Sequence, residues 1–266
     1  MGERDTNSFP PAVWPVHGLH PDNYGKALDI MQAGPVEGFS TQVSGHTDFF
    51  IASGASVIVL ADRARAGEWQ GEDALALLRR LVRVGSRSIV VCAGASQASV
   101  IDIAVRELRM DRQRVFGTAP EALASGIRAL AAAEADRSVR EVGLTVLGCP
   151  PGHVVVPWGD ATVAGFTAAR ALDEPALRRL SARTSHLWPP GPLALASAAA
   201  LAVRGVLGRS RQGLSVLREA MGADAYFLTC GAPIIPSLGL CDAIRVGPDV
   251  AEVWESHRDA VLLKDR

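Results

Sequence analysis

The sequence predicts an α/β fold, because short β-branched segments alternate with longer segments of helical periodicity. Three strongly apolar runs are typical of strands that are buried on both faces of a parallel sheet: residues 55–61, 88–93 and 144–147. A weaker strand is predicted at 114–117. Three segments with apolar residues every three or four positions predict the intervening helices: 72–84, 97–109 and 121–135.

The pattern changes after Gly148, where Pro150, Pro151 and Gly152 interrupt the chain. Beyond this point the sequence predicts a strand at 153–156 and helices at 174–187, 193–206 and 249–263. It also predicts antiparallel strands at 214–217, 226–228 and 243–246. We therefore expect two domains, an α/β half at 1–148 and an α+β half at 149–266.

The composition excludes several classes of protein. The chain has 266 residues, 48% of them hydrophobic, with a formal net charge of -1, which is typical of a folded globular protein. It has no long basic stripe, which argues against nucleic-acid binding. We expect no membrane span and no secretory signal, because the longest apolar run contains prolines and residues 1–23 are polar. We expect a cytoplasmic protein, because the four cysteines are far apart and suit reduced thiols.

The segment Gly25–Phe39, which reads GKALDIMQAGPVEGF, strongly resembles the helix that follows the second strand of bacterial malate dehydrogenases. Further segments match that lactate/malate dehydrogenase family in the same order: 44–48, 54–58, 114–117, 146–148, 163–165 and 191–193. The resemblance runs from about Val13 to the C-terminus. It implies a truncated Rossmann-type parallel sheet in 1–148, followed by an α+β domain of the family's C-terminal type in 149–266.

The resemblance also points to a missing cofactor site. The family binds its dinucleotide at a first strand and a glycine-rich turn, but residues 1–12 contain no such turn and are too short for a complete βαβ unit. The position of the family's ribose-binding acid is occupied by His17. We therefore expect no bound cofactor.

Six family positions that bind substrate or transfer a proton carry other residues in this chain. The substrate-binding arginines fall at Ala66, Glu72 and Gly126, and the substrate-binding asparagine falls at Ala95. The catalytic aspartate and histidine fall at Leu123 and Pro150. This comparison predicts that the chain is not an enzyme, with His153 as an alternative base after a local shift.

The same loop, Cys149-Pro150-Pro151-Gly152-His153, offers a thiol and an imidazole. A structural zinc site takes four ligands, so we expect no metal and interpret the loop as a proline-stiffened turn.

The best-matched helix packs across a two-fold axis in the family, so the resemblance implies a dimer interface. Its candidate residues are Ala27, Leu28, Ile30, Met31, Val36 and Phe39. The alternative is a helix that is buried within its own chain. We interpret the chain as a pseudoenzyme that acts as a structural, scaffold or regulatory subunit. Its partner is a second copy, a malate dehydrogenase-like paralogue or another protein.

Two other functions stay open. One is a small-molecule sensor that uses the vestigial cleft. The other is an enzyme of altered chemistry that uses Cys149, His153, Asp62 or Glu72.

Overall fold

The computed structural model describes ten stretches of the chain: 12–13, 23–46, 48–62, 69–84, 87–95, 97–111, 113–149, 153–207, 213–218 and 228–233. Its internal contacts divide the chain into two units. Unit 1 comprises residues 1–56 and 80–88, and unit 2 comprises residues 57–79 and 89–266. This division does not coincide with the boundary expected near residue 148.

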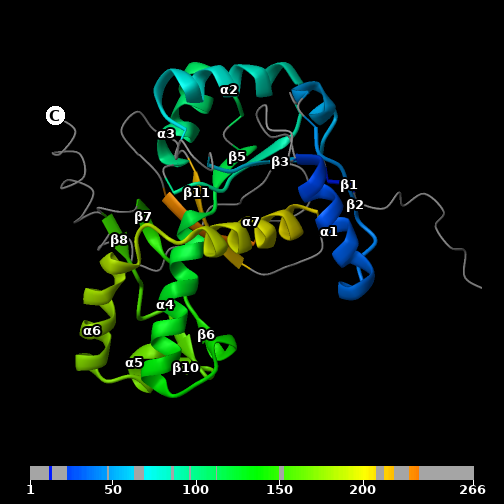
Figure 1. The fold of residues 1–266 in the computed structure, drawn as a ribbon. Helices are drawn as coiled ribbons and strands as arrows, with labels where there is room; N and C mark the ends of the chain where they lie inside the picture. The colour runs from blue at the N-terminus through cyan, green and yellow to red at the C-terminus, as the bar shows by residue number, and fades with distance from the viewer. Residues whose placement is uncertain are drawn as a thin grey trace, which may run out of the picture. The chain divides into compact units, whose positions relative to one another are not determined.

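Unit 2 contains a five-stranded sheet in the order β12-β11-β5-β4-β3 (Figure 1). Strands β3 (Val57–Leu60), β4 (Ile89–Cys92) and β5 (Val115–Gly117) are parallel, which confirms the predicted parallel sheet. Strands β11 (Gly213–Arg218) and β12 (Leu228–Pro233) extend it antiparallel, with Leu217 opposite Gly117. The sheet therefore joins segments from before and after residue 148.

Helices α4 (Ala119–Ala135), α6 (Glu174–Thr184) and α7 (Pro192–Val206) of unit 2 begin and end close to the predicted positions. The helix predicted at 97–109 is α3 (Gln97–Asp102), which continues as a π-helical turn (Ile103–Glu107). Helix α5 (Ala168–Ala171) was not predicted. Helix α7 packs on the sheet, where Ala199 and Ala202 meet Val91, Phe116 and Val216 in one core. Helix α2 (Gly71–Val84) begins in unit 2 and ends in unit 1.

A second core of unit 2 lies between α4, α6 and short strands. Strands β6 (Val142–Gly143), β9 (Thr162–Val163) and β10 (Phe166–Thr167) form a small antiparallel sheet. Strands β7 (Leu147–Cys149) and β8 (His153–Val155) form an antiparallel pair, which confirms the strand predicted at 153–156. Single 3₁₀ turns, η3 (Val139–Glu141) and η4 (Ser185–Leu187), follow α4 and α6.

The strand predicted at 144–147 is wrong for residues 144–146, which lie between β6 and β7. Side chains, rather than the backbone of a neighbouring strand, form the hydrogen bonds to the backbone of Leu144 and Val146. The guanidinium of Arg128 donates to the Leu144 carbonyl at 3.2 Å, and the Val146 N–H donates to Ser215 Oγ at 3.2 Å. These contacts replace the ladder that the apolar pattern predicted.

Unit 1 contains α1 (Asn23–Glu37), the parallel pair β1 (Ala12–Val13) and β2 (Gln42–Val43), and a 3₁₀ turn, η1 (Phe49–Ala52). The helix predicted from Gly25–Phe39 is confirmed. It ends at Glu37 because Gly38 takes a left-handed conformation with φ of 76°, and the N–H groups of Gly38 and Phe39 both donate to the Gly34 carbonyl.

Some predictions fall outside the described residues: the strand at 243–246, the helix at 249–263, and positions Ala66 and Pro150. Within the described part of the chain, no helix has the length and apolar character needed to cross a membrane.

Candidate functional site

Helix α1 exposes most of its apolar side chains. Between residues 25 and 37 only Ala27 and Gly34 are buried. Five of the six candidate interface residues are exposed, with Val36 at 85% and Leu28 at 53%, followed by Ile30, Met31 and Phe39. Ala27 differs, because it is buried within the chain itself.

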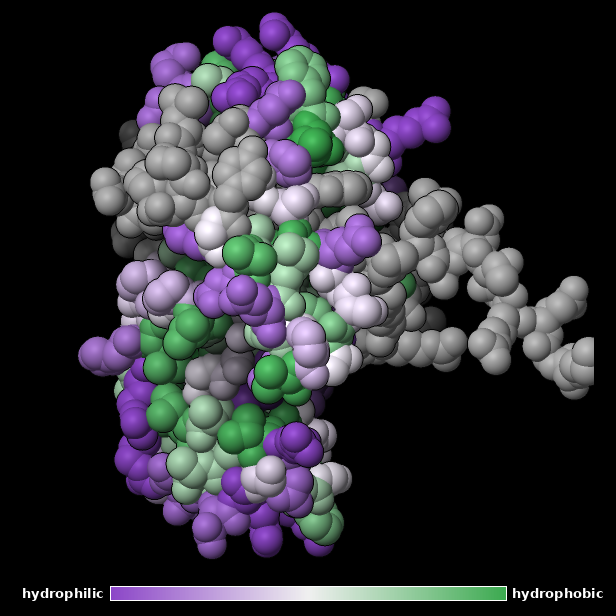
Figure 2. Space-filling model, turned by 45° about the vertical axis from the view of Figure 1, so that its right-hand side comes forward, coloured by the Kyte–Doolittle hydropathy of each residue, from purple (hydrophilic) through white to green (hydrophobic). Residues whose placement is uncertain are grey.

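Exposed apolar groups are concentrated in unit 1. Of the large hydrophobic side chains that the described residues expose, the majority belong to this smaller unit: Leu28, Ile30, Met31, Val36, Phe39, Phe50, Ile51 and Val82. Figure 2 shows hydrophobic residues reaching the surface among hydrophilic ones. Exposed apolar side chains that gather in one region are candidates for protein–protein contact.

The end of α1 is fixed by a contact between Gly34 and Phe39. A Cβ atom placed on Gly34 would lie 2.9 Å from the Phe39 carbonyl oxygen and 3.3 Å from its ring carbon Cε2. Only a glycine therefore lets Phe39 fold back over the last turn. The half-exposed ring is held against the helix and adds to its apolar surface.

A second group of functional candidates lies where β3, β4 and β5 end. The Asp62 carboxylate follows β3 and accepts a hydrogen bond from the Ala95 N–H at 3.2 Å. A side chain at Gly94 would overlap this carboxylate. Asp62 thus holds the turn after β4 at the carboxyl edge of the parallel strands, the edge at which open α/β sheets bind ligands.

Gln97 is a residue that the sequence did not single out. It begins α3, is 2% exposed, and neither Nε2 nor Oε1 of its side chain has a hydrogen-bond partner among the residues that the structure describes. The amide lies over Gly117 at the end of β5, and a Cβ atom on Gly117 would overlap it. An unpaired buried amide costs free energy, so it is a weak point of this edge. No spacing in the sequence indicated it.

The residues proposed for altered chemistry have other roles or are not described. Cys92, which was not among these residues, is not an activated nucleophile either, because burial raises the pKa of its thiol to about 12, with the Asp62 charge as the smaller cause. Asp62 is bound to the turn at Ala95. Glu72 is exposed in the first turn of α2. The side chains of Cys149 and His153 lie outside the described residues.

Leu123 and Gly126, where the resembled family has a catalytic aspartate and a substrate-binding arginine, lie in different surroundings. Leu123 is buried in the core between α4 and α6. A Cβ atom on Gly126 would lie 3.3 Å from Leu187 Cδ1, so a longer side chain there requires Leu187 to move. Within the described stretches no group of three His, Cys, Asp or Glu residues could hold a metal ion.

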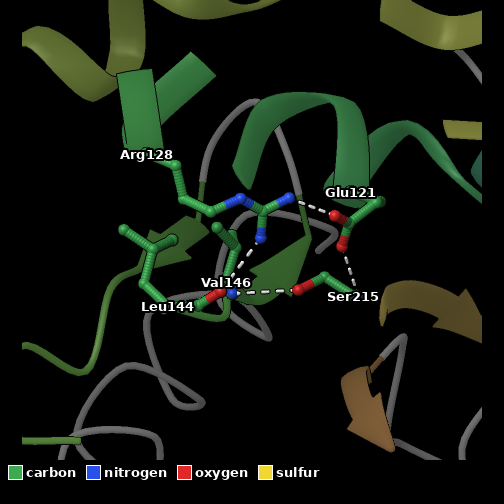
Figure 3. A network of polar contacts seen from close by, with 5 residues as sticks. All are labelled: Glu121, Arg128, Leu144, Val146 and Ser215. Atoms are coloured by element: carbon green, nitrogen blue, oxygen red, sulfur yellow. Dashed lines mark hydrogen bonds and ion pairs between the residues drawn. The ribbon is translucent and has the colours of Figure 1, made fainter. Parts of the chain in front are cut away.

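A buried polar network joins α4 to β11 and to residues 144–146 (Figure 3). The Glu121 carboxylate is 2% exposed, pairs with Arg128, and accepts the Ser215 N–H at 2.8 Å. Arg128 also donates to the Leu144 carbonyl. Every charge in the network is therefore paired, as buried charges require.

Comparison with known proteins identifies consistent relatives. No family model matches the chain. It is 29% identical over 170 residues to the malate dehydrogenase of Methanosarcina mazei, covering 60% of this chain and 55% of that protein. It is 25% identical over 231 residues to the malate dehydrogenase of Nitrosococcus oceani, covering 83% of this chain and 65% of that protein. The chain thus spans between about half and two thirds of the length of these relatives.

Solved structures show the same fold. The malate dehydrogenase of Salinibacter ruber has a TM-score of 0.82 at 20% identity, covering 96% of this chain and 88% of that chain. The malate dehydrogenase of Aeropyrum pernix has a TM-score of 0.80 at 15% identity, and the match covers 94% of this chain and 88% of that chain. The arrangement around the parallel sheet is therefore the Rossmann-type fold of these proteins.

These relatives correct one expectation. The prediction that the chain is not an enzyme is wrong on this comparison, because the sequence relatives and structural neighbours are named as dehydrogenases, which are enzymes. Substitutions at six motif positions predicted the loss of activity, and the structure does not show that loss. The sequence relatives are malate dehydrogenases, and the solved structures that share the fold include malate and lactate dehydrogenases, so the chain resembles the lactate/malate dehydrogenase family.

Proposed function

We propose that the chain is a malate dehydrogenase-like subunit that acts through protein–protein assembly, as a structural, scaffold or regulatory subunit. It forms a homodimer, or pairs with a malate dehydrogenase-like paralogue, through α1. The observation that carries this proposal is the exposure of Leu28, Ile30, Met31 and Val36 on α1 and of Phe39 just after it. The free, buried Cys92 supports a reducing compartment, and we assign the assembly to the cytoplasm.

Helix α1 gains little from its own chain. A 15-residue helix is marginal alone in water and obtains most of its stability by packing an apolar face. In α1 this packing is limited to Ala27 and Gly34 between residues 25 and 37. A partner that covers the exposed side chains would bury apolar surface, which is favourable by roughly 25 cal/mol per Å².

The charges of α1 also suit a contact surface. Its only ionisable side chains besides Tyr24 are Lys26, Asp29 and Glu37. Interface cores are depleted of charged residues and retain a polar rim. A solvated helix of this length would normally carry charges along its whole outer face.

Native mass spectrometry of the purified chain tests the proposal. We expect the mass of two chains, or of one chain plus one paralogue when the host's malate dehydrogenase-like protein is added in equal amount. A single-chain mass in both samples at about 10 μM would contradict an assembly of ordinary affinity.

The names of the relatives favour a second candidate function, malate dehydrogenation by this chain. Malate-dependent reduction of a nicotinamide dinucleotide tests it, with the chain alone and with the paralogue. A turnover of about 1 s⁻¹ or more by the chain alone, within the usual range of enzymes, would support this candidate. A change in the paralogue's own turnover when the chain is added would instead support a regulatory role for the chain.

A further inference from the structure

Strand β3 forms one edge of the five-stranded sheet, because among the described residues it has a single neighbouring strand, β4. The Leu60 carbonyl accepts the Ala93 N–H at 2.8 Å, so the backbone groups of Leu60 face β4. Backbone groups point alternately to the two sides of a strand, so the N–H and C=O groups of Val57 and Val59 face the free side. Within the described stretches these outward groups have no hydrogen-bond partner.

The composition of β3 fits a strand in the interior of a sheet. Its four residues are all apolar, like those of β4, and uniformly apolar strands are typical of parallel sheets that are covered on both faces. Three of the four residues of β4 are buried. No residue of β3 is buried, and the Val59 side chain is 47% exposed. The structure therefore leaves part of an interior-type strand in contact with water.

The free side of β3 lacks the features that protect natural sheet edges. Residues 55–61 contain no charged residue and no proline. The opposite edge strand, β12, includes Pro233, which has no N–H to offer to a further strand. An apolar edge without such protection is a template for pairing with another extended chain.

The size of this edge favours a short extended segment over a second copy of the chain. Just after β3, the Ala61 carbonyl accepts the Trp69 indole N–H at 2.9 Å, which ends the free stretch. Two copies that paired through four residues each would bury far less than the roughly 1,200 Å² of a stable interface between folded proteins. A flexible segment can instead add as a strand through main-chain hydrogen bonds, while its alternate side chains provide specificity.

We propose that β3 binds an extended segment of a partner protein, which adds a further strand to the sheet by hydrogen bonds to the backbone of Val57 and Val59. Val57 packs against the core that contains Ala199 and Ala202 of α7, and by alternation Val59 faces the same side of the sheet. The segment therefore carries apolar side chains at alternate positions, with neither proline nor charge where it pairs. This inference goes beyond the proposed assembly, because it uses β3 rather than α1.

Amide hydrogen exchange of the full chain, followed by NMR, tests the contact with the capped peptide KTVTVTK as the partner segment. In the chain alone the Val59 N–H should exchange rapidly. The peptide at about 1 mM should slow this exchange at least tenfold, whereas the control peptide KTVPVTK, which lacks the central N–H, should not. The Ile58 N–H, which faces β4, serves as an internal reference. A Val59 exchange rate that KTVTVTK leaves unchanged would overturn the inference.

Two variants separate a backbone contact from a general effect of substitution. Val59→Pro removes the outward N–H, which an edge strand tolerates, and should weaken peptide binding at least tenfold. Val59→Ile retains both the N–H and a β-branched apolar side chain, and should bind the peptide as the wild type does. Circular dichroism should show that both variants are folded. Equal binding by the two variants would contradict pairing through the backbone of β3.

The chain alone supplies a further check. A Val59 N–H that is already protected without peptide would overturn the inference. Protection that is lost on dilution would mean that a second copy occupies the edge, and protection at every concentration would mean that another segment of the same chain does. Met31→Glu should bind the peptide as the wild type does, so the outcome is separate from that of assembly through α1.

Discussion

Glu121 and Arg128 form a buried ion pair within α4 that also binds the backbone of two other segments (Figure 3). The carboxylate accepts the Ser215 N–H of β11, and the guanidinium donates to the Leu144 carbonyl. The pair therefore links the main sheet of unit 2 to the irregular segment that precedes β7. Its satisfied hydrogen bonds offset the cost of burying two charges.

Replacing Arg128 by methionine should destabilise the protein by about 3 kcal/mol, because it leaves the buried Glu121 carboxylate without its charged partner. Urea denaturation measures the loss. The control is Arg178→Met, since Arg178 pairs with Glu174 at the surface, with side chains 71% and 80% exposed. That variant should change the stability by less than about 1 kcal/mol. Equal effects of the two substitutions would contradict the role given to the buried network.

Replacing Gln97 by methionine should stabilise the protein by about 1 kcal/mol or more. The substitution retains a side chain of similar length and removes a buried amide that has no hydrogen-bond partner in the described part of the chain. Urea denaturation again gives the difference. A loss of stability would show that the amide is paired in solution, for example with water or a ligand at the strand ends. Gln113→Met in the turn before β5 serves as a control, because Gln113 is exposed.

The Cys92 thiol should make stability depend on alkaline pH. Burial, and to a smaller extent the Asp62 charge, raises its pKa to about 12 from its ordinary value of 9.0. Between these values the unfolded chain releases a proton that the folded chain retains, so stability is full below pH 9 and falls as the pH rises towards 12. Cys92→Ala removes this contribution.

Denaturation at pH 8.5 and 10.5 in the presence of a reducing agent checks this prediction. The wild type should lose about 2 kcal/mol more than Cys92→Ala over this interval, since one pKa unit corresponds to about 1.4 kcal/mol. Equal losses would mean that the thiol titrates normally in the folded protein.

The start of α6 depends on a single cap. Asp173 Oδ1 accepts the Ala176 N–H at 2.8 Å, so Asp173→Ala should cost about 1 kcal/mol. Asp173→Asn should retain most of the stability, because its amide oxygen can accept the same hydrogen bond. Thermal denaturation of the two variants distinguishes the lost cap from a general effect of removing a charge.

Periodicity and turn residues were sufficient to predict most of the described elements. Apolar runs predicted β3 and β4, and helical spacing predicted α2, α4 and α7. The family resemblance at Gly25–Phe39 predicted α1. Residues 144–146 were predicted as a strand because their pattern is apolar, although side chains of Arg128 and Ser215 take their backbone groups. Such long-range contacts leave no local signal.

The candidate site was less predictable from the sequence. The apolar composition of α1 was visible, but the exposure of Leu28 and the burial of Ala27 depend on tertiary packing. No sequence pattern singles out Gln97, because the position of its side-chain amide over Gly117 depends on the folded structure. The inference of a non-enzyme relied on substitutions at separate positions, and the relatives correct it.

Sedimentation equilibrium of the wild type, Met31→Glu and Val139→Glu tests the central claim, assembly through α1, most directly. Met31 and Val139 are similarly exposed, at 40% and 46%, so the two variants differ mainly in where the charge is placed. The wild type and Val139→Glu are expected to assemble, whereas Met31→Glu should dissociate at the same concentration. Assembly of all three with the same Kd would contradict it.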